Sequence, residues 1–139
     1  WVELDVQLTE DNVPVLIHDR TLDRTTNGSG EIKSTNSKSL TSLDAGYWFD
    51  ARFKGEKVPL LLNALNLCRE LNLGVNLEIK AYNASIHNTV FHTLSVVNEF
   101  GRDFENKLLF YSFDTAVLNT LKNLSPNSPR GIIVDKFNG

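Results

Sequence analysis

The chain has 139 residues, a formal net charge of −3, and 41% hydrophobic and 22% charged residues. This composition is typical of a globular domain, and the scattered Lys and Arg residues form no basic stripe, so we expect no nucleic-acid partner. No apolar run approaches the roughly 18 residues of a membrane span, and the single Cys68 excludes an intramolecular disulfide framework.

The first predicted strand is "VELDVQLT", residues 2–9. Side chains alternate between the two faces of a strand, so Glu3 and Asp5 share one face while the intervening apolar side chains share the other. Two adjacent carboxylates repel each other, and burying them without compensation is costly. A hard cation such as Mg²⁺ or Ca²⁺ takes oxygen ligands of this kind, and the stretch therefore predicts a metal site.

A second predicted strand, "VPVLIHD" (13–19), follows the turn-like residues 10–12 and carries His18 near its end. In a parallel β/α fold the active site lies at the carboxyl ends of the strands, where a histidine can accept or donate a proton near neutral pH. A lone histidine at such a place is more often structural, but this one is expected to share the rim with Glu3 and Asp5. Asp19 either orients His18 or caps the loop, and the sequence does not decide between these roles.

Residues 20–59 are rich in Thr, Ser, Asn and Gly and form a connection too long for an ordinary loop. Such a segment is usually functional or disordered. The aromatic residues Tyr47, Trp48, Phe49 and Phe53 indicate that at least its second half packs. We interpret it as a loop-rich insertion.

Helices and strands alternate after this segment. Helical spacing of apolar residues predicts helices at 61–71, 85–100 and from 115 to 124, with Gly101 as a stop and Asp114 as an N-cap. Three further predicted strands are "LGVNLEIKA" (73–81), "KLLFYSFD" (107–114) and "RGIIVDKF" (130–137). This order implies a mainly parallel sheet.

Glu78 and Lys80 share one face of the strand that contains "NLEIK". They are either a buried ion pair or part of a site in which Glu78 supplies a third carboxylate to the cation. Buried ion pairs add little net stability over apolar residues, so two polar strand faces in one small sheet favour function.

Four stretches carry a resemblance to a known family: "VELDVQLTEDNVPVLIHDRTLDRTTNGSG", "VPLLL", "NLEIK" and "FYSFD". In this order and spacing they resemble the glycerophosphodiester phosphodiesterase family over nearly the whole chain. The resemblance implies an α/β fold of the (β/α)₈ TIM-barrel, phosphodiesterase type, present here as a partial barrel. Residues 1–139 would be one domain, a fragment of that barrel with five of its eight strands.

The resemblance also implies the roles of the site residues. Glu3, Asp5 and Glu78 would hold one divalent cation, Mg²⁺ or Ca²⁺. His18 would be one of two catalytic histidines, and Lys80 would contact the substrate phosphate. Arg24 lies in the loop beside the phosphate region without an assigned role.

The chain departs from the family at both ends. The strand carrying His-Arg-Gly, with the first catalytic histidine, would lie upstream of Trp1, and two more strands would follow Gly139. We therefore expect the chain to be part of a longer protein and to be inactive alone. Its open strand edges would favour self-association, so a homo-oligomer is a further expectation.

The implied reaction is hydrolysis of a small-molecule glycerophosphodiester to glycerol 3-phosphate and an alcohol. One alternative is a lipid phosphodiesterase of the sphingomyelinase D or lysophospholipase D type, but those enzymes tend to have shorter connections where residues 20–59 lie. Another is a non-catalytic metal- or phosphate-binding module, which an upstream His-Arg-Gly would argue against. For location, we favour the cytoplasm over the periplasm or secretion.

Overall fold

The computed structural model describes residues 1–82, 84–100 and 102–135. The chain forms five strands and four α-helices within these ranges: β1 (Val2–Leu8), β2 (Pro14–Leu16), α1 (Ser37–Ser42), α2 (Leu61–Glu70), β3 (Val75–Ile79), α3 (Ile86–Glu99), β4 (Leu108–Ser112), α4 (Thr115–Leu124) and β5 (Arg130–Ile132). Three short 3₁₀ helices lie at Ile32–Ser34, Ala51–Phe53 and Arg102–Lys107.

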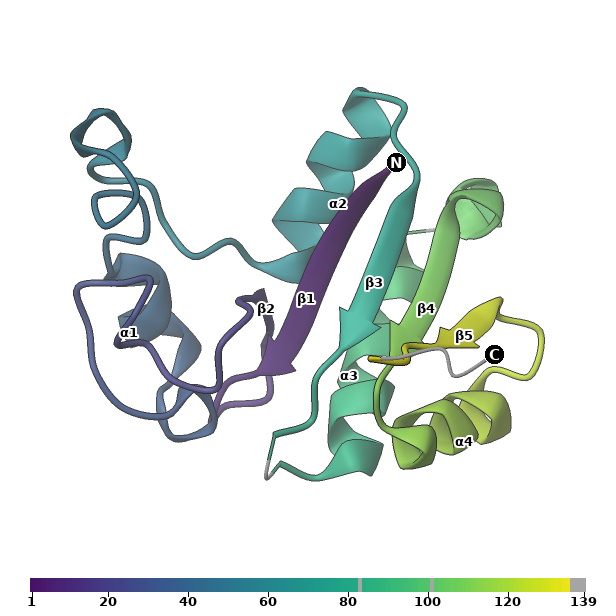
Figure 1. Cartoon of the computed structure of the whole chain (residues 1–139). Coiled ribbons are helices and arrows are strands. Elements are labelled where there is room, and N and C mark those ends of the chain that lie inside the picture. The colour runs from purple at the N-terminus through teal and green to yellow at the C-terminus, as the bar shows by residue number, and fades with distance from the viewer. Residues whose placement is uncertain (83, 101, 136–139) are drawn as a thin grey trace.

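The strands form one open sheet in the order β2-β1-β3-β4-β5 (Figure 1). β1 pairs with β3, β3 with β4 and β4 with β5, each time in parallel. The prediction of a mainly parallel sheet is therefore confirmed. The carboxyl ends of these strands meet at one end of the sheet, which is where function is expected in such folds.

β2 is the exception, because it pairs with β1 in antiparallel orientation, with Val6 opposite Leu16. For residues 13–19 the family resemblance implies a parallel barrel strand, whereas the short link at residues 10–12 favours a hairpin, and the structure shows the hairpin. The connection is too short for a parallel crossover. Asn12 adopts a left-handed φ of 60°, a conformation that asparagine tolerates, and the chain reverses there.

Asp11 fastens this hairpin to the start of α1. Its carboxylate accepts hydrogen bonds from Ser37 N (2.8 Å), Ser37 Oγ (2.6 Å) and Thr9 Oγ1 (2.6 Å). The hydroxyl groups of Ser37 and Thr9 favour the ionised form and lower the pKa of Asp11 from 3.8 to about 2.

We expect this carboxylate to make stability depend on pH in the acidic range. Because the pKa is lower in the folded protein, the stabilisation is present above pH 3.8 and is lost as the pH falls towards about 2. Thermal unfolding of wild type and Asp11→Asn should therefore differ most at neutral pH and converge between these two pH values. A difference that stays constant over this window would contradict the assignment.

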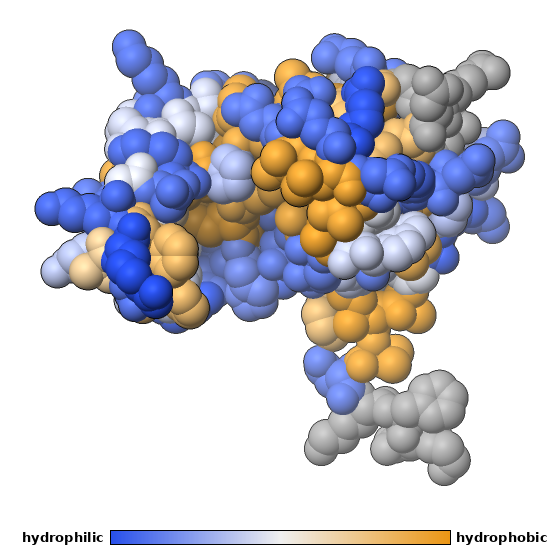
Figure 2. All heavy atoms as spheres, turned by 90° about the horizontal axis from the view of Figure 1, so that it is seen from above, coloured by the Kyte–Doolittle hydropathy of each residue, from blue (hydrophilic) through white to orange (hydrophobic). Residues whose placement is uncertain are grey.

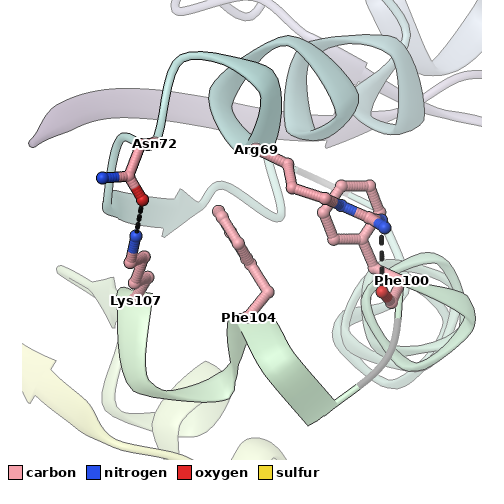
Figure 3. Close-up of a pocket in the computed structure, with 5 residues that line it drawn as sticks. All are labelled: Arg69, Asn72, Phe100, Phe104 and Lys107. Atoms are coloured by element: carbon pink, nitrogen blue, oxygen red, sulfur yellow. Dashed lines mark hydrogen bonds between the residues drawn. The ribbon is translucent and has the colours of Figure 1, made fainter.

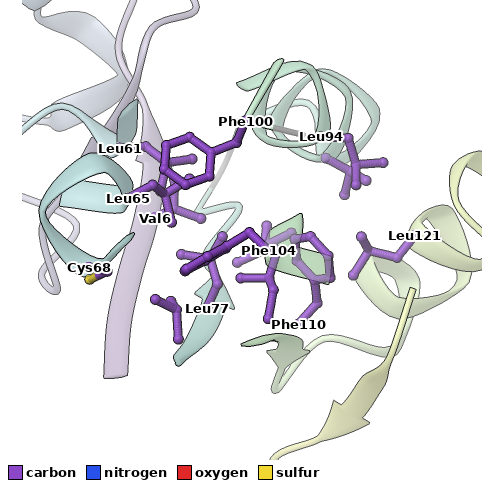
Figure 4. Close-up of a cluster of buried hydrophobic side chains, with 14 of the residues drawn as sticks. Val6, Leu61, Leu65, Cys68, Leu77, Leu94, Phe100, Phe104, Phe110 and Leu121 are labelled. Atoms are coloured by element: carbon purple, nitrogen blue, oxygen red, sulfur yellow. The ribbon is translucent and has the colours of Figure 1, made fainter. Parts of the chain in front are cut away.

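The three long helices lie where the sequence predicts them, and they pack on one face of the sheet. Ser85 caps α3 by accepting from Asn88 N (3.3 Å), and Asp114 caps α4 by accepting from Ala116 N (2.8 Å). The expected stop at Gly101 lies outside the described residues. Helices and strands share one buried cluster, which includes Val6, Leu61, Leu65, Leu77, Ile79, Val90, Phe110, Leu121 and Cys68 (Figure 4).

Residues 20–59 lie beside β1 as a separate lobe (Figure 1). Part of this segment closes over a second buried cluster, composed of Val15, Ile17, Leu22, Ile32, Leu40 and Val58. The expectation that at least the second half of residues 20–59 packs is confirmed, because Leu40 and Val58 are buried there, but the aromatic side chains do not form the core. Tyr47, Trp48, Phe49 and Phe53 are 60%, 48%, 71% and 42% exposed, and the aliphatic residues form the core instead.

The edge of the sheet at β5 carries uncovered apolar side chains. Ile132 and Val134 are 53% and 56% exposed, and Figure 2 shows a hydrophobic group standing out from the body of the molecule. An uncovered edge of this kind is able to pair with a further strand. In the described part of the chain, no helix combines the length and the apolar character needed to cross a bilayer.

Candidate active site

The polar residues singled out in the sequence lie on the sheet face opposite the helices. Val6, Leu77 and Ile79 point into the helix-side core, so their neighbours along each strand point the other way. The strand register places Asp5 beside Glu78 and Glu78 beside Tyr111. One row of polar side chains therefore crosses three adjacent parallel strands.

Glu3, Asp5 and Glu78 converge, as the sequence predicts. Each offers a carboxylate oxygen, and these oxygens lie within 4.8 Å of one another. The ammonium Nζ of Lys80 lies 3.1 Å from Asp5 Oδ1 and 3.1 Å from Glu78 Oε1, and its side chain is only 5% exposed. Three carboxylates and one ammonium leave two negative charges uncompensated, which suits a divalent cation bound through oxygen.

The ionisation of this cluster reflects both its burial and its three carboxylates. Burial raises the pKa of Glu78, and Lys80 offsets this only in part, while the charge of Asp5 adds to it. Burial opposes the charge of Lys80, yet Glu78 and Asp5 outweigh it and raise the pKa of Lys80. Negative charge therefore exceeds positive charge among these groups.

Tyr111 lies on the same face of the sheet, although its sequence context did not mark it as a site residue. Burial raises its pKa, and the charge of Glu3, to which Tyr111 is hydrogen-bonded, raises it further. The phenol therefore stays protonated and donates to the carboxylate. The alternation in "FYSFD", combined with the register of β4, is the signal that would have found it.

His18 follows β2 and lies at the carboxyl half of β1. The neighbouring Ile17 N donates to Asp5 O (3.0 Å), which joins this loop directly to the strand that carries the carboxylates. The His18 side chain is 62% exposed, and its Nδ1 lies 2.7 Å from Asp19 Oδ1. Of the two roles left open for Asp19, the structure shows the contact that orients His18.

Arg24 holds the other side of Asp19. Its Nε and Nη2 donate to the two carboxylate oxygens at 2.6 and 2.7 Å. Arg24, and after it His18, keeps the pKa of Asp19 well below its usual range, so the carboxylate is charged at neutral pH. The Arg24 guanidinium also lies 5.4 Å from the centre of the Trp48 ring. A chain of contacts thus links the lobe of residues 20–59 to His18.

A cavity of about 210 Å³ lies at the amino ends of β3 and β4, away from the carboxyl ends of the strands (Figure 3). The Arg69 guanidinium lies 3.5 Å from the centre of the Phe100 ring and donates to Phe100 O (3.2 Å), and Lys107 donates to the side chain of Asn72. Cations are favourable near the carbonyl ends of helices such as α2 and α3. We therefore interpret this cavity as part of helix-end packing.

Lys80→Met tests the charge balance of the carboxylate cluster. In the longer protein that we expect to contain this chain, the change removes the ammonium group that pairs with Asp5 and Glu78. The free energy of unfolding without metal should fall by about 3 to 5 kcal/mol. Chemical denaturation with and without Mg²⁺ measures this, and the metal should recover part of the loss. Lys122→Met, at an exposed position of α4, is the matched control, and equal losses in both variants would contradict the interpretation.

Comparisons with known proteins agree on one family. The model of the glycerophosphoryl diester phosphodiesterase family matches residues 1–138. A glycerophosphodiester phosphodiesterase of Caldanaerobacter subterraneus is 35% identical, over 95% of this chain and 54% of the relative. A putative glycerophosphodiester phosphodiesterase of Bacillus subtilis is 33% identical, over 95% of this chain and 53% of the relative. The chain spans about half the length of these curated relatives.

Solved structures agree with the sequence comparison. A phosphodiesterase of Oleispira antarctica, solved with the product sn-glycerol-3-phosphate, matches with a TM-score of 0.91 and 37% identity, over 96% of this chain and 54% of that one. A glycerophosphodiester phosphodiesterase of Agrobacterium tumefaciens matches with a TM-score of 0.80 and 36% identity, over 92% and 52%. The open α/β sheet is thus a partial TIM barrel, and the chain belongs to the glycerophosphoryl diester phosphodiesterase family.

Proposed function

We propose that this chain comes from an enzyme that hydrolyses glycerophosphodiesters to glycerol 3-phosphate and an alcohol, with Mg²⁺ or Ca²⁺ as cofactor. The observation that carries the proposal is the convergence of Glu3, Asp5 and Glu78. Lys80 pairs with Asp5 and Glu78, and two of the three negative charges are left over. Family membership supports the reaction class. The product bound to the Oleispira antarctica relative supports the product assigned here.

Glu3, Asp5 and Glu78 are the proposed ligands of the cation. When bound, such an ion polarises a phosphate oxygen and offsets the charge that develops in the transition state. Lys80 is assigned to the substrate phosphate, because it is the buried cation among these carboxylates. Tyr111 holds Glu3 through its hydrogen bond and so helps to fix the direction of that ligand.

His18 is the proposed proton-transfer residue. Asp19 binds Nδ1, which turns Nε2 outward as the nitrogen that can meet substrate. In the neutral ring Nε2 carries the lone pair and accepts a proton, whereas in the imidazolium form it donates one. The arrangement serves either end of the reaction, and the partner histidine is expected upstream of Trp1.

The test is an enzyme-coupled assay for glycerol 3-phosphate, with glycerophosphocholine as substrate. The full-length protein should be active with Mg²⁺ or Ca²⁺ and should lose activity with a chelator. The 139-residue chain alone should show negligible turnover, since the loss of one proton-transfer group costs about 10²- to 10⁴-fold. A full-length protein that binds metal but hydrolyses nothing would favour the non-catalytic module. Robust activity of the chain alone would refute the placement of a second histidine upstream.

A lipid phosphodiesterase remains a second candidate because of one observation. Tyr47, Trp48, Phe49 and Phe53 expose aromatic rings on the lobe that Arg24 links to His18. Aromatic side chains of this kind favour contact with lipid interfaces. Running the assay with lysophosphatidylcholine, and following release of its alcohol, separates the two. Faster turnover of the lipid than of glycerophosphocholine would reverse the preference.

A further inference from the structure

Gln7 is a buried polar residue to which neither the sequence nor the proposed mechanism assigns a role. It lies on β1, on the same face as Glu3 and Asp5 and one alternation further towards the carboxyl end. Its exposed fraction is only 4%. A buried carboxamide is costly unless its hydrogen-bonding capacity is used, so its partners indicate why it is there.

The partners are three consecutive main-chain carbonyls of the loop that carries His18. Gln7 Nε2 lies 2.7 Å from Ile17 O, 3.2 Å from His18 O and 2.8 Å from Asp19 O. Carbonyl oxygens only accept hydrogen bonds, so the nitrogen and not the oxygen of the carboxamide faces them. One amide group with two N–H donors thus binds the backbone on both sides of His18 and at His18 itself.

Residues 17–19 lie beyond the strand pairing between β1 and β2. β2 ends at Leu16, and the pairing with β1 ends there too. Ile17 N still donates to Asp5 O (3.0 Å), while the imidazole is held from outside by Asp19. Gln7 therefore supplies the inner support at the point where the hairpin ladder stops and the histidine begins.

We propose that Gln7 is a positioning residue that fixes the backbone of His18 relative to the carboxylates of β1. The inference rests on the proposed catalytic role of His18. One face of β1 then has two roles. Glu3 and Asp5 bind the cation, and Gln7 sets the distance between the cation and His18. A misplacement of about 1 Å in a catalytic group can cost about 100-fold in rate, so such a support affects turnover without touching substrate.

Two nearly isosteric substitutions in the full-length protein test the inference with glycerophosphocholine. Gln7→Met removes the donors, and Gln7→Glu replaces them with an acceptor that faces three carbonyls. We expect kcat to fall about 10- to 100-fold in Gln7→Met and further in Gln7→Glu. KM and the affinity for Mg²⁺ should stay unchanged. A crystal structure of Gln7→Met should show residues 17–19 displaced.

Controls separate positioning from loss of stability and from failure of the proposed function. Val90→Ala removes buried volume from α3 in the helix-side core and should lower the melting temperature while leaving kcat unchanged. Wild-type kcat in Gln7→Met, or a loss of kcat in Val90→Ala equal to that in Gln7→Met, overturns the positioning role. Wild-type kcat in His18→Ala overturns the catalytic role of His18 and the positioning role with it. A large loss in His18→Ala beside full activity in Gln7→Met overturns the positioning role alone.

Discussion

Replacing His18 by alanine should lower kcat for glycerophosphocholine by about 10²- to 10⁴-fold in the full-length protein, the range expected for loss of a general acid or base. The imidazole is exposed, and its Nδ1 is held by Asp19, so the change removes the reactive nitrogen without opening a core cavity. Steady-state kinetics with the coupled assay measure kcat and KM separately. The melting temperature should change little.

His87→Ala is the matched control for this variant. His87 is an exposed histidine on α3, where it stacks on Phe91 (6.3 Å between ring centres), and it has no part in the proposed site. Its loss should leave kcat unchanged. If His18→Ala also kept wild-type kcat, His18 would be a structural residue, and the proton-transfer role would fall to groups outside this chain.

Glu78→Gln should weaken binding of the divalent cation by at least about 100-fold, because loss of an outer partner of a ligand already costs about 10- to 100-fold. The substitution keeps the size of the side chain and removes one of the three converging negative charges. It also leaves Lys80 paired with Asp5 alone. Calorimetric titration of the full-length protein with Mg²⁺ and with Ca²⁺ measures the affinity, and comparison of the two ions also decides which is preferred.

Glu70→Gln provides the control with the same change of charge. Glu70 is exposed at the carboxyl end of α2, which leads to the amino end of β3 and lies away from the carboxylate cluster. Its affinity for metal should match that of wild type. Equal affinities in Glu78→Gln and wild type would remove Glu78 from the metal site.

Local patterns in the sequence predicted most of the fold, because helix caps and side-chain periodicity act over a few residues. Asp114 and Ser85 mark helix starts that the structure confirms through side-chain hydrogen bonds. Strand alternation likewise predicted that Glu3, Asp5, Glu78 and Lys80 would meet. The sequence left the orientation of β2 open, because the family resemblance implied a parallel strand while the short turn at residues 10–12 implied a hairpin, which the structure shows.

The remaining features depend on what a side chain meets far along the chain, and periodicity does not report that. Gln7 has no charge to attract attention, and its partners are backbone carbonyls, which every residue possesses. Trp48 indicated that its segment packs because it is aromatic, yet its own side chain is half exposed with Arg24 over its ring. Tyr111 required the register of β4 against β3, which only the assembled sheet provides.

Because β1 and β2 form a hairpin, the contact with the His18 loop and the contact with Glu78 close loops of different length and differ in their cost in chain entropy. Ile17 meets Asp5 across 12 positions of the chain, from 5 to 17, whereas Glu78 meets Asp5 across 73 positions, from 5 to 78. Closing the longer loop costs about 1.6 kcal/mol more in chain entropy. The contacts among β1, Gln7 and the His18 loop therefore form at a lower cost in chain entropy than the contact with Glu78. The third carboxylate joins only after residues 61–80 have been synthesised and packed.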